Sequence, residues 1–284
     1  VSFDSWTIKA LDRHHPLAQV RLTGSADVGG ATDLLIDINT ADVSDLVDRL
    51  GLLTERQRQM ISGGHLTGDV RVVGAGPEQL LTITAGLRAA KLRIRLDKTH
   101  KITRNLGVLA DVEIDGASTI ADIRRIEVST ESANTKAGTL LASGRWPLTG
   151  QAAMTSAASM SVTVKEWDAQ PYVDFLDILP GRQPGSLMVT GALNVEQRAG
   201  GRTMVVQGSE TIGPLTVAVK GRAGPEPATI HVEHDVVWSE DEILIPTLSM
   251  NSERPMGRAD HVTMRGTSRR GLRPHLELRG SVDA

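Results

Sequence analysis

His65-Leu-Thr-Gly-Asp-Val-Arg-Val-Val73 is the stretch of sequence that decides the fold. Leu66, Val70 and Val72 stand at even positions, whereas the odd positions between them carry Thr67, Asp69 and Arg71. Successive side chains of a β-strand point to opposite faces of the sheet. The segment therefore predicts a strand with one apolar face and one solvated face.

The same alternation recurs along the chain. An antiparallel sheet with one covered face produces this pattern, while buried parallel strands would be apolar throughout. The links between the segments are short and rich in glycine, which suits hairpins better than helical crossovers. A meandering antiparallel sheet is the prediction. The other alternating segments are 81–85, 92–96, 160–165, 215–220 and 275–279.

Two segments break the alternation and predict short amphipathic helices. The first, near 42–60, has apolar residues at helical spacing after Asp42, which suits the N-cap. The second, near 168–179, has Pro171 in its first turn and ends before Pro180. Each helix is followed by glycine and then by an alternating strand. The pattern predicts about two repeats, which divide the chain into domains at 1–165 and 166–284.

Composition excludes several classes of function. The 284 residues carry a net charge of −3 and only 2% aromatic residues, which suits neither phosphate neutralisation nor base stacking, so no nucleic-acid partner is expected. Cysteine is absent, which removes disulfides, thiolate metal sites and a cysteine nucleophile. No apolar run approaches a membrane span, and no signal peptide is visible. Because the first residue is Val1 in sequence that already reads as folded, we expect a piece of a longer protein.

No motif predicts catalysis, a metal or a cofactor. Asp111 to Asp122 spaces its carboxylates like a calcium loop, but the alternation with Val112 and Ile114 favours a strand that ends in a hairpin turn. His231 and His234 are three residues apart, so on a strand they face opposite sides. There is neither a nucleophile elbow nor a complete phosphate-binding glycine loop.

A basic stretch near the C-terminus has two interpretations. It could contact anionic headgroups or phosphates, but such runs are more often solvated surface. Its arginines are Arg265, Arg269, Arg270 and Arg273.

Three stretches resemble the AsmA/TamB superfamily. The short helix followed by Ser62-Gly-Gly-His-Leu-Thr-Gly-Asp-Val-Arg-Val-Val-Gly74 carries the resemblance, and 167–191 and Ala142-Ser-Gly-Arg-Trp-Pro-Leu-Thr-Gly150 are similar to the same superfamily. The resemblance implies an envelope protein of double-membrane bacteria, held in the inner membrane by an N-terminal helix. It also implies a long curled sheet with an apolar concave face, which moves phospholipid between the two membranes. The anchor is missing from this chain, as expected of an internal fragment.

The sequence thus predicts a mostly β fold, an extended and curled antiparallel sheet with an open groove and two short helices. The hypothesis is a non-enzymatic, periplasmic segment that binds or conducts lipid, with phospholipid, other envelope proteins and neighbouring repeats of the parent chain as partners. The alternative is a structural or interaction β module, a closed sandwich or solenoid without ligand, in which the same residues are core. The groove-facing candidates are Leu66, Val70, Val72, Ile83, Leu92, Ile94, Val162, Val164, Leu187, Val189, Leu193, Val217 and Val219.

Overall fold

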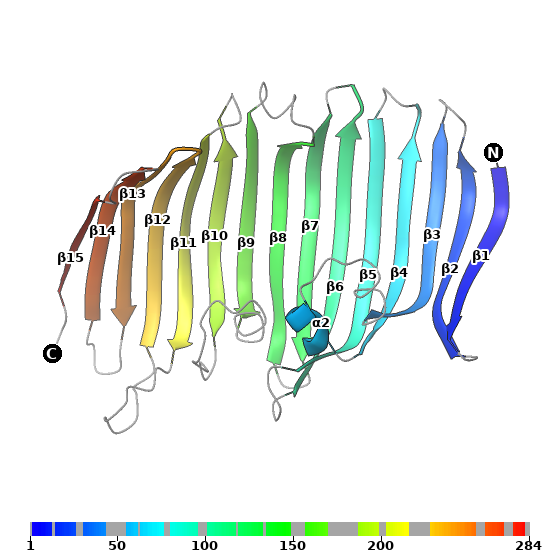
Figure 1. Cartoon of the computed structure of the whole chain (residues 1–284), viewed down its shortest axis with the longest axis horizontal. Helices are drawn as coiled ribbons and strands as arrows, with labels where there is room; N and C mark the ends of the chain where they lie inside the picture. The colour runs from blue at the N-terminus through cyan, green and yellow to red at the C-terminus, as the bar shows by residue number, and fades with distance from the viewer. Residues whose placement is uncertain are drawn as a thin grey trace. The chain divides into compact units, whose positions relative to one another are not determined.

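Within the described residues, the computed structural model is one open sheet of fifteen antiparallel strands that follow each other in chain order from β1 to β15 (Figure 1). The prediction of a mostly β, antiparallel meander is confirmed. The structure describes residues 2–12, 15–26, 31–43, 55–61, 63–76, 80–95, 101–117, 119–132, 135–148, 157–169, 187–198, 203–215, 228–253, 259–269 and 275–281.

The chain divides into two compact units, the first ending at Ser143 within β8 and the second beginning at Gly144. The predicted domains 1–165 and 166–284 stay a prediction. The first unit contains β1 (Ser2–Asp12), β2 (His15–Ala26), β3 (Thr32–Asp42), α2 (Glu55–Met60), β4 (His65–Gly74), β5 (Leu80–Arg95), β6 (Lys101–Asp115), β7 (Ile120–Ser132) and the start of β8 (Thr135–Pro147). The second contains the end of β8, then β9 (Ala158–Asp168), β10 (Met188–Gln197), β11 (Thr203–Leu215), β12 (Ala228–Ser239), β13 (Glu242–Glu253), β14 (Ala259–Arg269) and β15 (His275–Ser281).

Cross-strand register gives the first unit one apolar and one polar face. One row of paired residues runs Leu34, Val72, Ile83, Val112 and Ile123 across five strands. The neighbouring row is its polar counterpart, and runs through Asp33, Val73, Thr82, Glu113 and Asp122. Directly paired residues share a face, so the predicted two-faced strand at 65–73 is confirmed and its neighbours follow the same division.

Short turns join neighbouring strands, one of them at the hairpin turn predicted for the segment 111–122. Between β6 and β7 the backbone N–H of Ala117 donates to Asp115 Oδ1 at 3.0 Å. Before β13 the Ser239 hydroxyl lies 3.1 Å from both the N and the O atom of Glu242. Such side-chain hydrogen bonds to nearby backbone stabilise tight turns.

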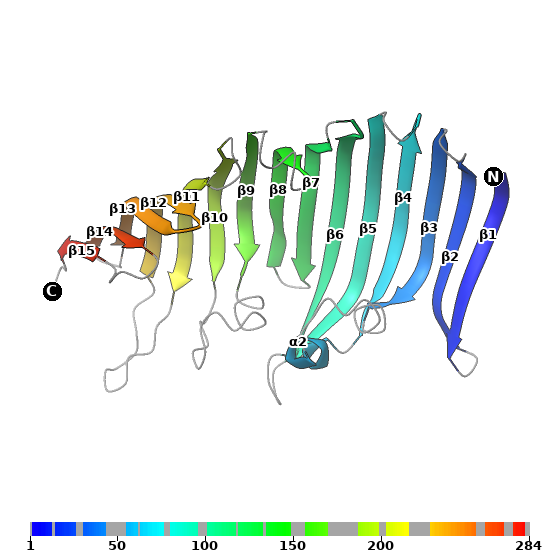
Figure 2. The same ribbon diagram turned by 45° about the horizontal axis from the view of Figure 1, so that its top comes forward.

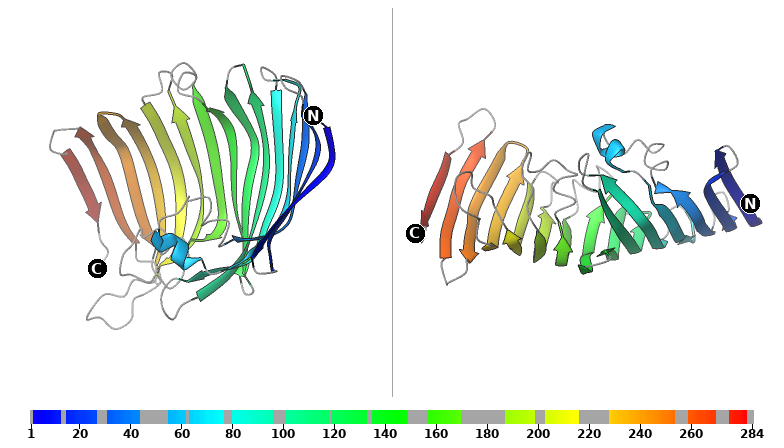
Figure 3. Two further views of the ribbon diagram at one scale, coloured as in Figure 1. Left: turned by 45° about the vertical axis from the view of Figure 1, so that its right-hand side comes forward. Right: turned by 90° about the horizontal axis from the view of Figure 1, so that it is seen from below.

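The predicted helix near 42–60 is seen only as α2, which has six residues. Asp42 is the last residue of β3 and residues 44–54 lie outside the described part of the chain. The helix stands on one side of the sheet, close to β5 (Figures 2 and 3). Arg93 N donates to Gly63 O at 3.0 Å, which links the segment between α2 and β4 to the end of β5.

The second predicted helix, near 168–179, falls almost wholly outside the described residues. Asp168 closes β9 and pairs with Met188, while 170–186 are not described. Ala169 N donates to Leu187 O at 2.8 Å, so the strand ladder continues to the edge of this segment. Neither helix is therefore seen at its predicted length.

Glycines allow three strands to approach their neighbours closely. Gly68 has a φ of 136°, and a Cβ added there would lie 2.0 Å from the carbonyl O of Gly86. Gly24 and Gly144 have the same conformation and the same close approach, to the carbonyls of Asp33 and Ser159. An L side chain at such a position is strained by its backbone and by the missing space.

We expect Gly68→Ala to lower the free energy of unfolding by about 2 kcal/mol or more, because both strain and overpacking act there. Urea denaturation followed by far-UV circular dichroism measures the change. Gly86→Ala is the matched control on the facing strand, since its Cβ would meet nothing closer than 3.8 Å. Equal stability of the two variants would contradict the role given to Gly68.

Candidate functional site

The apolar face of the first unit collects four of the predicted groove residues. Val70 pairs with Ala85, Val72 pairs with Ile83, and Leu66 pairs with Ala89. All four predicted residues are partly exposed. They therefore lie together on one accessible aliphatic surface, called the first apolar face below.

Leu92 and Ile94, also predicted for this surface, lie near the end of β5. Leu92 is buried, with 7% of its surface exposed. A Cβ added at Gly64 would lie 3.4 Å from the Leu92 side chain. Ile94 pairs with Ile102, and its side chain is outside the described part. Leu92 thus packs beneath the segment that leads from α2 into β4.

A second apolar face lies on β9 to β13 of the second unit. Val162 pairs with Leu193, and Val189 pairs with Trp167. Val164 pairs with Gly191 on the same face. These predicted residues are partly exposed, whereas Leu187, just before β10, is buried at 7%. Val217 and Val219 lie outside the described residues.

Sequence reasoning missed many residues of the two faces. Strands β3, β6 and β7 of the first unit and β12 of the second also alternate, and the same period-two test applied to every segment would have found them. The register places the missed residues beside the predicted ones. They include Ile36, Ile38, Val108, Val112, Ile126, Val206, Val232 and Val236.

The described elements lay no second layer of sheet over either face. The most extensive contacts between these elements join neighbouring strands, and α2 also contacts β5. A sheet with an apolar face has to cover it with another element, a partner or a ligand. The two apolar faces are therefore candidate binding surfaces.

In each unit, the face opposite the apolar face carries paired charges. Arg71 bonds Asp33 at 3.1 Å on the first unit, and Arg269 bonds Glu242 at 2.8 Å on the second. Each hydrogen bond to a carboxylate raises the pKa of its arginine above the ordinary value. Arg269 thus has a partner within the sheet, while Arg270 and Arg273 lie outside the described residues.

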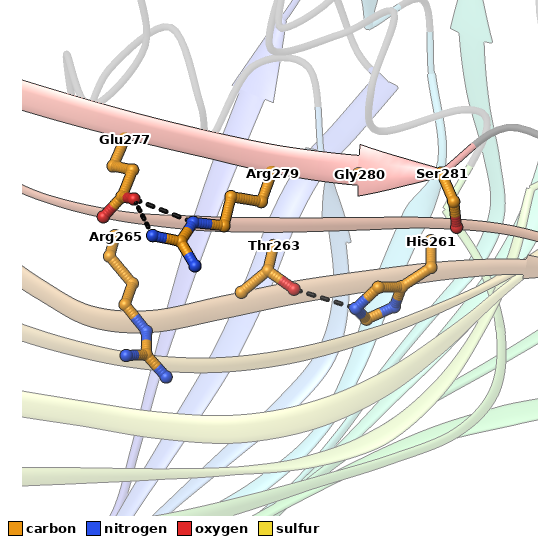
Figure 4. A pocket seen from close by; sticks show the side chains of 7 residues that line it. All are labelled: His261, Thr263, Arg265, Glu277, Arg279, Gly280 and Ser281. Carbon is orange, nitrogen blue, oxygen red and sulfur yellow. Dashed lines mark hydrogen bonds and ion pairs between the residues drawn. The ribbon is translucent and has the colours of Figure 1, made fainter.

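A polar pocket of about 420 Å³ lies on this charged face, between β14 and β15 (Figure 4). Arg279 bonds Glu277 there, and His261 Nε2 lies 2.9 Å from the hydroxyl of Thr263. Arg265 also lines the pocket, and Figure 4 draws no ion pair for it. The lining of the pocket includes two arginines beside one glutamate, and it lies along the last described strand.

The other chemical candidates do not assemble into a reactive site. His231 pairs with Thr211 and His234 with Gly208, so the two imidazoles lie on opposite faces as predicted. Asp111 and Glu113 share the polar face of β6, and Asp115 begins the turn, which confirms the hairpin interpretation over a calcium loop. In the part of the chain that is described, no three His, Asp or Glu side chains gather as metal ligands.

No protein-family model, curated protein or solved structure matches this chain. Among the described residues, no helix has the length and apolar character needed to cross a bilayer.

We expect Leu92→Ala to lower the free energy of unfolding by about 2–5 kcal/mol, because it leaves a cavity beneath the α2 segment. Leu109→Ala is the control on the polar face of β6, where Leu109 is 47% exposed, and should change stability by less than about 0.5 kcal/mol. Urea denaturation compares the two. Similar losses would show that Leu92 is not part of a packed core.

Proposed function

We propose that the two apolar faces bind the acyl chains of lipids, and that the chain is a non-enzymatic lipid-binding or lipid-conducting segment. The observation that supports this most strongly is the pair of partly exposed aliphatic faces, over which the described elements lay no second sheet. Burial of each methylene group contributes up to about 0.8 kcal/mol, so a long acyl chain gains several kcal/mol even when only one side of it is covered.

The composition of the faces favours acyl chains over other ligands. Rings of sugars and bases stack on aromatic side chains, which make up only 2% of this protein. Branched aliphatic side chains such as Val70, Val72 and Ile83 offer no directional contacts. They suit a flexible hydrocarbon chain that needs exclusion from water and little else.

The resemblance to the AsmA/TamB superfamily gives the proposal its biological setting. In that setting the sheet curls into an open groove of about two repeats, works in the periplasm, and belongs to a parent protein anchored in the inner membrane. Phospholipid would pass between the membranes along the groove, and neighbouring repeats or other envelope proteins would extend it. The mechanism is passive, because acyl chains lie on the apolar face and no residue reacts.

We expect Val72→Asp to reduce the phospholipid bound by the purified protein about tenfold or more, since a carboxylate on the first apolar face opposes burial of hydrocarbon. Val73→Asp is the matched control, because Val73 is the next residue, is 39% exposed and faces the polar side. Native mass spectrometry, followed by organic extraction and lipid analysis, measures the bound lipid in variants whose circular dichroism is unchanged.

The second unit is tested in the same way with Val195→Asp and its neighbour Asn194→Asp. Val195 pairs with Met160 and Val206 on the second apolar face, whereas Asn194 pairs with Ser161 and Gln207 on the other side. We expect lipid to be lost from the first variant and kept by the second.

A protein that purifies without lipid and stays free of it after incubation with phospholipid would contradict the proposal. The result would favour the structural or interaction module, in which protein covers the two apolar faces. In that case Val72→Asp and Val195→Asp would change stability or association, and none of the four Asp variants would change the amount of bound lipid.

A further inference from the structure

One charged pair interrupts the second apolar face. Glu210 on β11 lies in the row of residues that includes Val232 and Val164, and His234 on β12 lies in the neighbouring row of the same face, with Leu193 and Val162. Glu210 Oε1 lies 3.1 Å from His234 Nε2, and the two side chains are 19% and 17% exposed. A carboxylate at an aliphatic surface is costly unless it is paired and hydrogen-bonded, so its position needs a physical reason.

Two glycines make room for this pair. A Cβ added at Gly208 would lie 2.4 Å from Glu210 Oε1 and 2.8 Å from His234 Nε2. A Cβ added at Gly191 would lie 2.8 Å from Glu210 Cγ. The carboxylate therefore lies flat against the sheet in a depression that any larger residue at these positions would fill.

The hydrogen bonds fit a neutral imidazole beside an ionised carboxylate. His234 Nδ1 is buried and has no hydrogen-bond partner among the residues that the structure describes. With its proton on Nε2, the ring donates a hydrogen bond from Nε2 to Glu210, and Nδ1 carries no proton. A doubly protonated ring would instead bury a second N–H donor without an acceptor, which is the costlier state.

The pair therefore carries a negative charge that the face does not neutralise. The register of β9 to β14 places no Lys or Arg on this face among the described residues, and the other acid on it, Asp260, bonds Ser252. Because Glu210 remains partly exposed, its second oxygen can accept a hydrogen bond from a ligand. A cationic donor is the complement that the site lacks.

We propose that Glu210, positioned by His234, recognises the ammonium group of an amine-bearing phospholipid whose acyl chains lie on the second apolar face. This inference rests on the proposed lipid-binding function and adds headgroup selectivity to it. An ammonium group donates to the carboxylate, whereas a headgroup with net negative charge is repelled by it.

The test offers the protein equimolar vesicles of phosphatidylethanolamine and phosphatidylglycerol with identical acyl chains, and measures the ratio of bound lipids by native mass spectrometry and extraction. The wild-type protein should enrich the ethanolamine lipid about tenfold, as a charge-assisted hydrogen bond in a partly desolvated site allows. Glu210→Gln keeps the shape of the side chain and should bring the ratio close to one. Gly208→Ala, which displaces the carboxylate, should lower the ratio as well.

Glu233→Gln is the matched control, because Glu233 precedes His234 on β12 and lies exposed on the opposite face. It should keep the enrichment of the wild type. A wild-type ratio equal to that of the vesicles would overturn the headgroup proposal while the lipid-binding function stands. Equal loss in Glu233→Gln and Glu210→Gln would also overturn it, since it would indicate a general effect of charge. Failure to bind either lipid would overturn the proposed function, and the headgroup proposal with it.

Discussion

The residue-by-residue register between neighbouring strands is the constraint on which the two faces depend. A slip of one residue would move every apolar side chain of a strand to the polar face. Within β5 the alternation of apolar residues shifts by one position, because Leu87 and Ala89 are followed by Leu92 and not by an apolar residue at position 91. A β-bulge at Lys91, with a φ of 53°, absorbs the extra residue and returns Leu92 to the apolar side. Asn105 Oδ1 accepts the Lys91 N–H at 2.9 Å, so the bulge leaves this donor satisfied.

The second unit also accommodates a shift in the apolar alternation with a β-bulge. In β9 the apolar phase changes between Val164 and Trp167, and the bulge residue Glu166 has a φ of 46° and donates its N–H to Thr190 Oγ1 at 3.0 Å. The pairing of β3 with β4 also holds one extra residue, opposite Thr67. Thr67 and Thr190 each precede a glycine that lies against the following strand. These shared features support the predicted repeat, whose boundaries stay a prediction.

Period-two alternation was enough to predict an antiparallel meander and the two faces of segments such as 65–73, because alternate residues of a strand point to opposite faces. It was not applied to every segment, and residues of β3, β7 and β12 were missed. It could not predict how far the strands extend. Asp42 and Asp168 suit a helix cap by local preference, yet both are held in strands by pairing with His65 and Met188. Nor could it find Glu210 and His234, which are 24 residues apart and meet only through the register of β11 and β12. Each bulge adds one unpaired residue to a strand and so shifts the register. Which residues pair across two strands therefore cannot be derived from the sequence alone.

The contrast between the two faces bears on how such a sheet could select a ligand. Aliphatic contacts are nearly independent of orientation, so a face made only of Val, Ile, Leu and Ala distinguishes hydrocarbon from water but hardly one lipid from another. Among the described residues of β1 to β7, the one charged side chain in the rows of the first apolar face is Arg104, opposite Leu92 near the end of β5. The second face places Glu210 amid its aliphatic rows and holds it there with a histidine and two glycines. Because polar groups discriminate strongly only where water is partly excluded, the proposed selectivity for the headgroup is assigned to the second face and the proposed binding of acyl chains to both.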